Sequence, residues 1–223
     1  MSIAIGNTSS ASSNGSGTTI ASSASVLTTG NTNIVLVRGA TGSGTVTGIA
    51  DTAGNKYYRI GRVIAGYTLE IWYCPNCTGH ATNVVTATYG AAQTFRTICT
   101  MEVSGLGTAP AILTNDMRIV LTATTITSGQ ISSSQDDFLI VMAGQTSNTA
   151  QTWTPETGFT QAVQDSDHIS TITYKVATAE ITGSTFTLTA TGAQDKGLFT
   201  IVFEATPAAE GGAGGEAFAP FLG

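Results

Sequence analysis

The sequence predicts an all-β protein: an antiparallel β-sandwich, jelly-roll-like, with about ten strands and extended Gly/Ser-rich terminal arms. Three observations lead to this prediction. Short runs rich in Val, Ile, Thr and aromatic residues alternate with Gly, Asn and Asp turn signals. No segment shows a 3.6-residue apolar period with helix caps. The length of 223 residues suits one large sandwich domain.

The strands are expected in the following order. Residues 33–38 carry four consecutive apolar side chains, and the segment 51–55 is a turn because its Gly and Asn tolerate positive φ. Residues 67–74 alternate, with Tyr67 and Leu69 on one face of the strand. Further strands are expected at residues 44–50, 56–60, 83–89, 94–103, 117–126, 137–143, 168–178, 184–190 and 197–205. The last of these is apolar on both faces, which is typical of a central strand.

The two ends of the chain differ in composition from its middle. Residues 1–28 form a low-complexity arm of Ser, Thr, Gly, Ala and Asn, with little apolar content to offset the entropy of ordering. Residues 29–207 form the sandwich, and residues 208–223 form a Gly-rich second arm. This second arm ends in an apolar tip with Phe218, Phe221 and Leu222. Such a tip either docks into a neighbouring subunit, folds back on its own domain, or stays disordered.

Charge is scarce and net negative. Charged residues make up only 10% of the chain, against about 25% in globular proteins. The eight Lys and Arg residues are scattered singly, so we expect no nucleic-acid partner and no attraction to anionic membranes. No run of 18 apolar residues predicts a membrane span, and the N-terminus lacks the features of a secretory signal. A virion protein needs neither a membrane span nor a secretory signal, because it leaves the cell by lysis.

Four segments resemble a known domain: residues 48–61, 69–73, 95–105 and 136–140. They combine an Asp-x-x-Gly-Asn turn, aromatic strands and a paired-Asp strand start. The chain thereby resembles a β-sandwich domain, jelly-roll or Ig-like, that recurs in phage virion and bacterial surface proteins of uncharacterised function. The resemblance covers about residues 30–205 and implies a structural, decoration or adhesin-like role without catalytic residues. The Cys74–Cys77 segment departs from it, since a plain turn is expected there.

The cysteines suggest one metal candidate. Cys74 and Cys77 have the C-x-x-C spacing of a metal knuckle, and His80 with Cys99 would complete four zinc ligands. Against a metal, the sequence shows no second close ligand pair. The alternatives are a turn with two ordinary thiols or a local disulfide. We therefore predict no cofactor.

No other cluster predicts catalysis. The adjacent Asp136 and Asp137 point to opposite faces of a strand, so they cannot flank one bond. The segment 165–168, Asp-Ser-Asp-His, offers oxygen ligands for a cation such as calcium but lacks the pattern of an EF-hand loop. His80 and His168 are the only candidate bases, and no nucleophile elbow is present. The sequence therefore predicts a protein that is not an enzyme.

Three functions follow from these observations. The first is a virion structural protein, a capsid decoration, tail or fibre subunit, whose partners are copies of itself and other virion proteins. The second is a subunit of a non-phage extracellular filament. The third is a carbohydrate-binding or adhesin module, in which Trp153 stacks on a surface glycan. The expected location is the virion, or alternatively the extracellular space.

Overall fold

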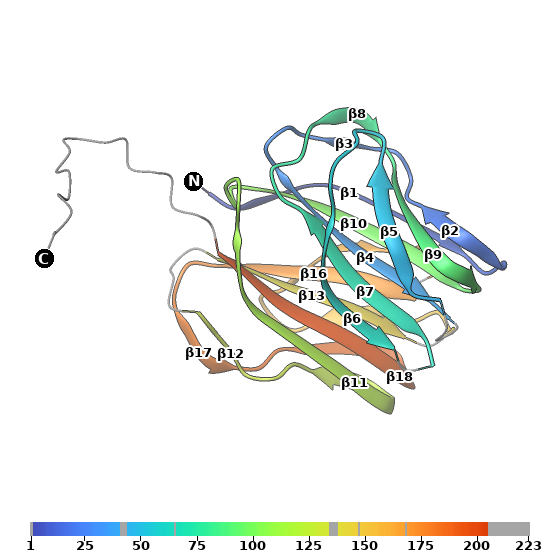
Figure 1. Cartoon of the computed structure of the whole chain (residues 1–223). Coiled ribbons are helices and arrows are strands. Elements are labelled where there is room, and N and C mark those ends of the chain that lie inside the picture. Colours follow the sequence, from blue (N-terminus) through green and yellow to red (C-terminus); the bar gives the residue numbers. More distant parts are fainter. Residues whose placement is uncertain are drawn as a thin grey trace, which may run out of the picture.

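A computed structural model describes residues 2–40, 44–64, 66–133, 138–146, 148–167 and 169–204, with residue 114 described in its backbone alone. These residues form 18 strands in several antiparallel sheets (Figure 1). The predicted all-β class is confirmed, whereas the predicted number of about ten strands is wrong, because residues 1–28 add three strands and short strands that were not expected add five more, β8, β12, β14, β15 and β17. Within the described ranges, no helix is long and apolar enough to span a membrane.

The first large sheet has five antiparallel strands. Its order is β1 (Ala4–Ser13), β10 (Arg96–Ser104), β4 (Thr32–Gly39), β7 (Thr68–Cys74) and β6 (Tyr58–Ile64). The central strand β4 is buried along its whole length. Burial on both faces explains why residues 34–37 form an unbroken apolar run.

The second large sheet packs against the first. Its order is β11 (Ala111–Thr127), β18 (Thr187–Glu204), β13 (Phe138–Thr146), β16 (Ser170–Ala177) and β15 (Thr160–Gln164), while β14 (Trp153–Pro155) also pairs with β18. The central position of β18 agrees with the apolar run predicted at residues 197–205. Smaller sheets pair β2 (Gly17–Ala21) with β9 (Val85–Gln93) and β5 (Val46–Asp51), β3 (Ser25–Leu27) with β8 (His80–Asn83), and β12 (Ile131–Ser133) with β17 (Ile181–Ser184).

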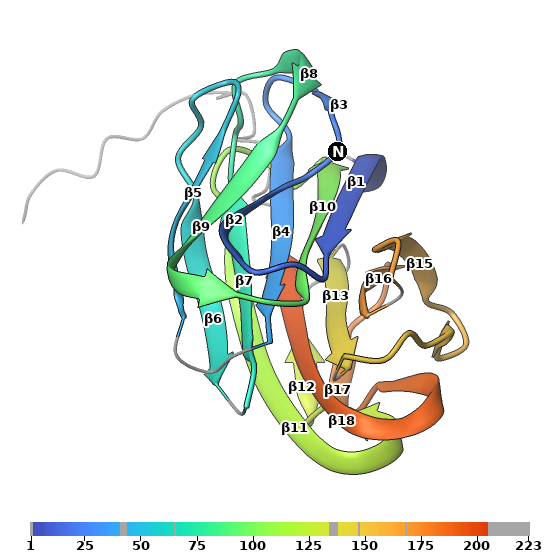
Figure 2. The same ribbon diagram turned by 90° about the vertical axis from the view of Figure 1, so that its right-hand side faces the viewer.

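Three layers of apolar side chains hold these sheets together. Figure 2 shows the arrangement of the sheets that these layers join. The main core lies between the two large sheets and includes Ile34, Leu36 and Phe199. A second layer, with Val35 and Val37, lies between the first large sheet and the β2–β9–β5 sheet. A third covers the other face of the second large sheet. Successive side chains of β4 therefore pack alternately into the main core and the second layer, as the two-residue period of a strand requires.

The N-terminal segment corrects one prediction. Residues 4–27 do not form a loose arm, because β1, β2 and β3 pair with β10, β9 and β8. The buried carboxylate of Glu102 explains much of this order. It accepts hydrogen bonds from the backbone N–H and Nδ2 of Asn7 at 3.1 and 2.9 Å, and from Thr28 N–H and Asn31 Nδ2 at 2.7 Å each. The second predicted arm, with Phe218, Phe221 and Leu222, lies outside the described residues.

Candidate functional site

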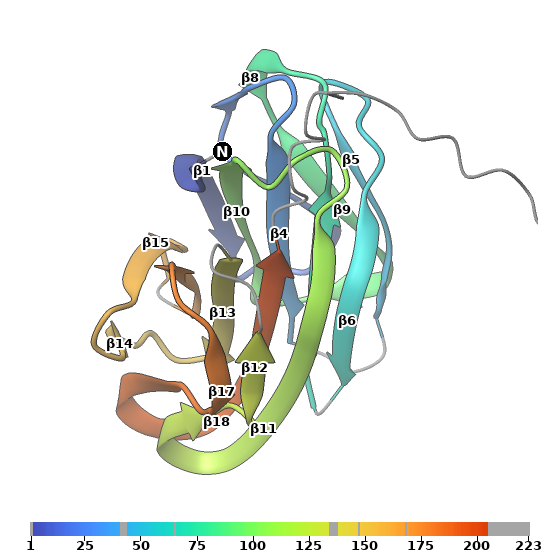
Figure 3. The same cartoon turned by 90° about the vertical axis from the view of Figure 1, so that its left-hand side faces the viewer.

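Two neighbouring edge strands carry most of the exposed apolar side chains. Among the described residues, seven large hydrophobic side chains are exposed, and six of them lie on β6 or β11; the seventh is Val26 on β3. We call the six the apolar margin: Tyr58, Ile64, Leu113, Met117, Ile119 and Leu121. The two strands lie side by side, since Asn115 Nδ2 donates to the carbonyl of Ile60 at 2.9 Å (Figure 3).

Part of the apolar margin continues the main core to the outside, whereas Ile64 points to the opposite face of the first large sheet from its neighbour Val63, which lies in the main core. Met117 pairs with Phe199 of β18, whose ring lies in the core, so Met117 faces the same side of the sheet. Strand β6 packs close here, because a Cβ on Gly61 would come within 2.7 Å of the Phe199 ring. Strand β11 runs past the end of β6 (Figure 1), and Leu121 near this overhang is 73% exposed. The sandwich is thus apolar where its β6–β11 side opens to solvent.

Strand β11 also has an open backbone edge. In the part of the chain that the structure describes, the only strand that pairs with β11 in a sheet is β18. The pairing is regular from residue 114 to Val120 and is interrupted by bulges on both sides of this stretch. On the face opposite Met117, Arg118 Nε donates to Asp116 Oδ2 at 3.2 Å. A regular, unpaired stretch is a ready template for another strand.

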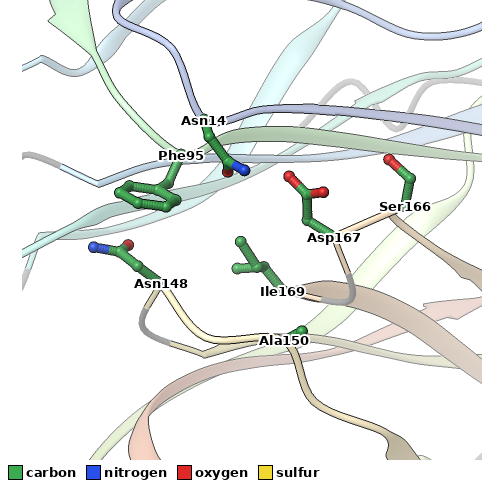
Figure 4. A pocket seen from close by; sticks show the side chains of 7 residues that line it. All are labelled: Asn14, Phe95, Asn148, Ala150, Ser166, Asp167 and Ile169. Carbon is green, nitrogen blue, oxygen red and sulfur yellow. The ribbon is translucent and has the colours of Figure 1, made fainter.

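A second feature is a pocket at one end of the sandwich (Figure 4). Its volume is about 370 Å³. It lies among four connections, β1–β2, β9–β10, β13–β14 and β15–β16. Its lining comprises Asn14, Phe95, Asn148, Ala150, Ser166, Asp167 and Ile169. We call it the loop-end pocket.

Two buried charged groups fix this pocket. The guanidinium of Arg38, 1% exposed, donates to Gln145 Oε1 at 2.9 Å and to the Phe95 carbonyl and Asn148 Oδ1 at 2.5 Å each. Burial lowers the pKa of Arg38 to about 10, so the group remains protonated at neutral pH. The buried carboxylate of Asp165 accepts hydrogen bonds from the backbone N–H groups of Asp167, Ile169 and Ser170.

Those contacts also bear on the predicted cation site. Burial raises the pKa of Asp165, although the three backbone hydrogen bonds oppose this shift. Its oxygens are committed to holding the turn after β15, which leaves them poorly placed as metal ligands. His168 of the same candidate site, like Asp136 and Asp137, lies outside the described residues.

The four candidate zinc ligands do not gather. Cys74 and Cys77 are buried in the second layer, whereas Cys99 lies in the main core on the other face of the first large sheet. His80 Nδ1 accepts a hydrogen bond from Thr82 N–H at 3.1 Å. Among the described residues, no group of three or more His, Cys, Asp or Glu side chains is placed to hold a metal ion.

Cys74 and Cys77 are in contact within one turn. All three cysteines are free thiols, and Cys77 Sγ donates to the Cys74 carbonyl at 3.2 Å. A hydrogen bond between the two side chains lowers the pKa of Cys74 and raises that of Cys77. Both thiols are at most 3% exposed, so they pack as small apolar side chains.

Two aromatic residues differ from their predicted places. Trp153, predicted to stack on a surface glycan, begins β14 and is only 3% exposed within the third apolar layer, so it cannot stack on a glycan there. Phe95, which falls within the strand expected at residues 94–103, lies in the turn before β10 with φ at 44°. That turn faces the loop-end pocket, a place the strand alternation did not predict. For β11, the alternation of Met117, Ile119 and Leu121 was a usable signal of one apolar face.

The comparisons with known proteins give no match. No family model, no curated protein and no solved structure is similar to the chain at a significant level. The resemblance to virion and surface domains therefore stays a prediction.

Proposed function

We propose that the chain is a structural subunit that associates with copies of itself along the β6–β11 side. The observation that carries this proposal is the apolar margin, which holds six of the seven exposed large hydrophobic side chains of the described residues. Exposed large apolar side chains that gather on one part of a soluble protein commonly mark interaction sites. Following the resemblance, we propose the virion as the setting, with the chain as a capsid decoration, tail or fibre subunit of jelly-roll type.

The preferred partner is a second copy of β11. The regular stretch from residue 114 to Val120 is centred on Met117. If two copies pair antiparallel about a two-fold axis at Met117, Asp116 of each copy lies opposite Arg118 of the other. Opposite charges facing each other across strands stabilise the pairing. A two-fold interface also uses the same patch on both subunits, which is the commonest arrangement of homo-oligomers.

The apolar margin supplies the energy for this association. Met117 and Ile119 are 46% and 41% exposed. Burying a whole Leu or Met side chain contributes about 1.5–3 kcal/mol, so a half-exposed one contributes about 1 kcal/mol. Several such side chains on each copy, together with the backbone hydrogen bonds, offset the cost of bringing two subunits together.

The two-fold arrangement gives a sharp test, because residue 117 of one copy faces residue 117 of the other. Met117→Asp and Met117→Lys each place like charges together, so each variant alone should be monomeric. Mixing the two variants should restore association, because opposite charges then meet. Sedimentation velocity measures the mass in each case, and thermal unfolding checks that both variants fold.

Val26 provides the matched control. It is 49% exposed and lies on β3, away from the β6–β11 side. Val26→Asp should leave association unchanged. Full association of both Met117 variants, or a monomeric wild type at every concentration, would contradict the proposal.

Deleting residues 211–223 should leave the domain folded and weaken assembly of the wild type, as an apolar tip that docks on a neighbour requires.

Two alternatives use the same molecule differently. An extracellular filament subunit would employ the same apolar margin, and electron microscopy would show polymers without nucleic acid. A carbohydrate-binding module would need an aromatic platform other than the buried Trp153. Both alternatives, like the proposal itself, involve no enzymatic step, and a hydrolase activity in a broad substrate screen would count against all three.

A further inference from the structure

The loop-end pocket gathers groups that complement a neutral polar ring. Asn14, Asn148, Ser166 and Asp167 supply amide, hydroxyl and carboxylate groups at its wall, and Ile169 lies among them (Figure 4). The half-buried ring of Phe95 forms another part of the lining. A pyranose has an apolar C–H face that packs on an aromatic ring, and hydroxyls at its rim that both donate and accept hydrogen bonds.

The charge of the pocket argues against other ligand classes. Asp167 is the one ionisable side chain in its lining as the structure describes it. Arg38 lies behind the lining, but its buried guanidinium is engaged by Gln145, Phe95 and Asn148, so the charge that faces a ligand is the Asp167 carboxylate. A carboxylate repels phosphates, sulfates and organic acids, while a hard cation usually requires several oxygen ligands with more than one carboxylate. A single carboxylate beside amides suits a neutral ligand, because it accepts hydrogen bonds from sugar hydroxyls strongly.

The pocket is also held ready for a ligand. Phe95 has φ at 44°, a region that costs free energy for a residue with a side chain. Arg38 holds both the Phe95 carbonyl and the Asn148 side chain, and Asp165 holds the backbone of Asp167 and Ile169. Groups fixed before binding lose less conformational entropy when a ligand arrives.

From this combination we infer that the loop-end pocket binds a neutral sugar, one pyranose unit of a surface glycan, with Phe95 stacked on its apolar face. Asp167, Asn14 and Ser166 accept from or donate to its hydroxyls. This inference goes beyond self-association, because the pocket and the apolar margin share no residue. It also moves the glycan contact from Trp153 to the β9–β10 turn.

The test screens the purified full chain on an array of defined neutral and acidic glycans. The best neutral hit is then titrated by isothermal calorimetry. Phe95→Leu, which keeps an apolar side chain but loses the ring, should weaken binding at least tenfold. Asp167→Asn should weaken it severalfold, while Glu180→Gln, an exposed carboxylate outside the pocket, should bind like the wild type.

Several results would overturn the inference. These are no neutral hit on the array, binding confined to acidic glycans, or equal affinity for the wild type and both pocket variants. Thermal unfolding of each variant separates lost binding from lost folding. Met117→Asp should bind the sugar as the wild type does, so failure of the self-association proposal and failure of this one are distinguishable.

Discussion

The two open sides of the sandwich differ in the chemistry of their edge strands. On one side, β1 and β15 meet through serine hydrogen bonds, with Ser10 Oγ donating to the Gln164 carbonyl at 3.1 Å and Ser12 and Ser166 hydroxyls 2.6 Å apart. On the other, β6 and β11 expose the apolar margin. The first side satisfies its polar groups within one chain. The second leaves apolar surface and an unpaired backbone edge.

This difference gives the low-complexity N-terminal segment a physical role. A strand of Ser, Thr and Asn contributes little apolar burial but many hydrogen-bonding groups. As the edge strand of the first large sheet, β1 pairs with β10 and presents polar side chains to solvent. A polar edge discourages pairing with strands of other chains. The contrast suggests that association is directed to one side, and the following changes test each side in turn.

The largest effect is expected at the β1 side from Glu102→Ala. The substitution leaves donors of Asn7, Thr28 and Asn31 without their shared acceptor. Since hydrogen bonds to a charged group are worth about 1.5–3 kcal/mol each, we expect a loss of about 3 kcal/mol or more in unfolding free energy. Urea unfolding measures it. The exposed Glu180→Ala is the control, and an equal, small loss in both variants would show that Glu102 does not anchor the N-terminal segment.

The same carboxylate predicts a pH dependence. Burial alone raises the pKa of Glu102, but hydrogen bonds from Asn7, Thr28 and Asn31 outweigh it and leave the pKa below its ordinary value. A depressed folded-state pKa gives stability that is present above the unfolded value of about 4.3 and is lost as pH falls through the folded value. The stability difference between wild type and Glu102→Gln should therefore shrink as pH falls from 6 to 3 in urea titrations. A constant difference would contradict this.

At the β6 side, Gly61→Val should cost about 1–3 kcal/mol, because the added side chain meets the buried Phe199 ring and overpacks the contact. It should also weaken self-association by shifting β6 relative to β11. Gly48 of β5 is the matched control, since a Cβ there meets no atom within 4 Å. Thermal unfolding and sedimentation give the two readouts, and similar results for both glycines would argue against close packing at this edge.

The smallest effect is expected from Ser9→Ala. The hydroxyls of Ser9 and Thr100 lie 2.8 Å apart in a buried site between β1 and β10. Losing one such hydrogen bond costs about 1 kcal/mol. Ser16→Ala, at an exposed position, should change stability by less than about 0.5 kcal/mol. If the two serines behave alike in chemical denaturation, the serine contacts of β1 do not stabilise this side.

The sequence predicted what depends on local pattern. The apolar runs of β4 and β18 identify central strands, because burial on both faces removes the polar alternation. The order of residues 4–27 was missed, since its stabilising acceptor, Glu102, is separated from Asn7 by 95 positions. Trp153 was misplaced for a similar reason: it was predicted to contact a surface glycan, whereas the ring packs in a layer assembled from distant strands. For the apolar margin, the alternation of Met117, Ile119 and Leu121 indicated an apolar face, but the sequence did not predict its exposure, because exposure depends on where β6 ends relative to β11.

The most direct test of the contrast between the two sides is amide hydrogen exchange at two protein concentrations, a low one and one tenfold to a hundredfold higher. We expect residues 9–13 of β1 to be protected at both, since their pairing with β10 lies within one chain. Residues 114–120 of β11 should exchange faster at low concentration and gain protection at the higher one, as association pairs their open edge. Rapid exchange throughout β1, or protection of β11 that is independent of concentration, would contradict the account.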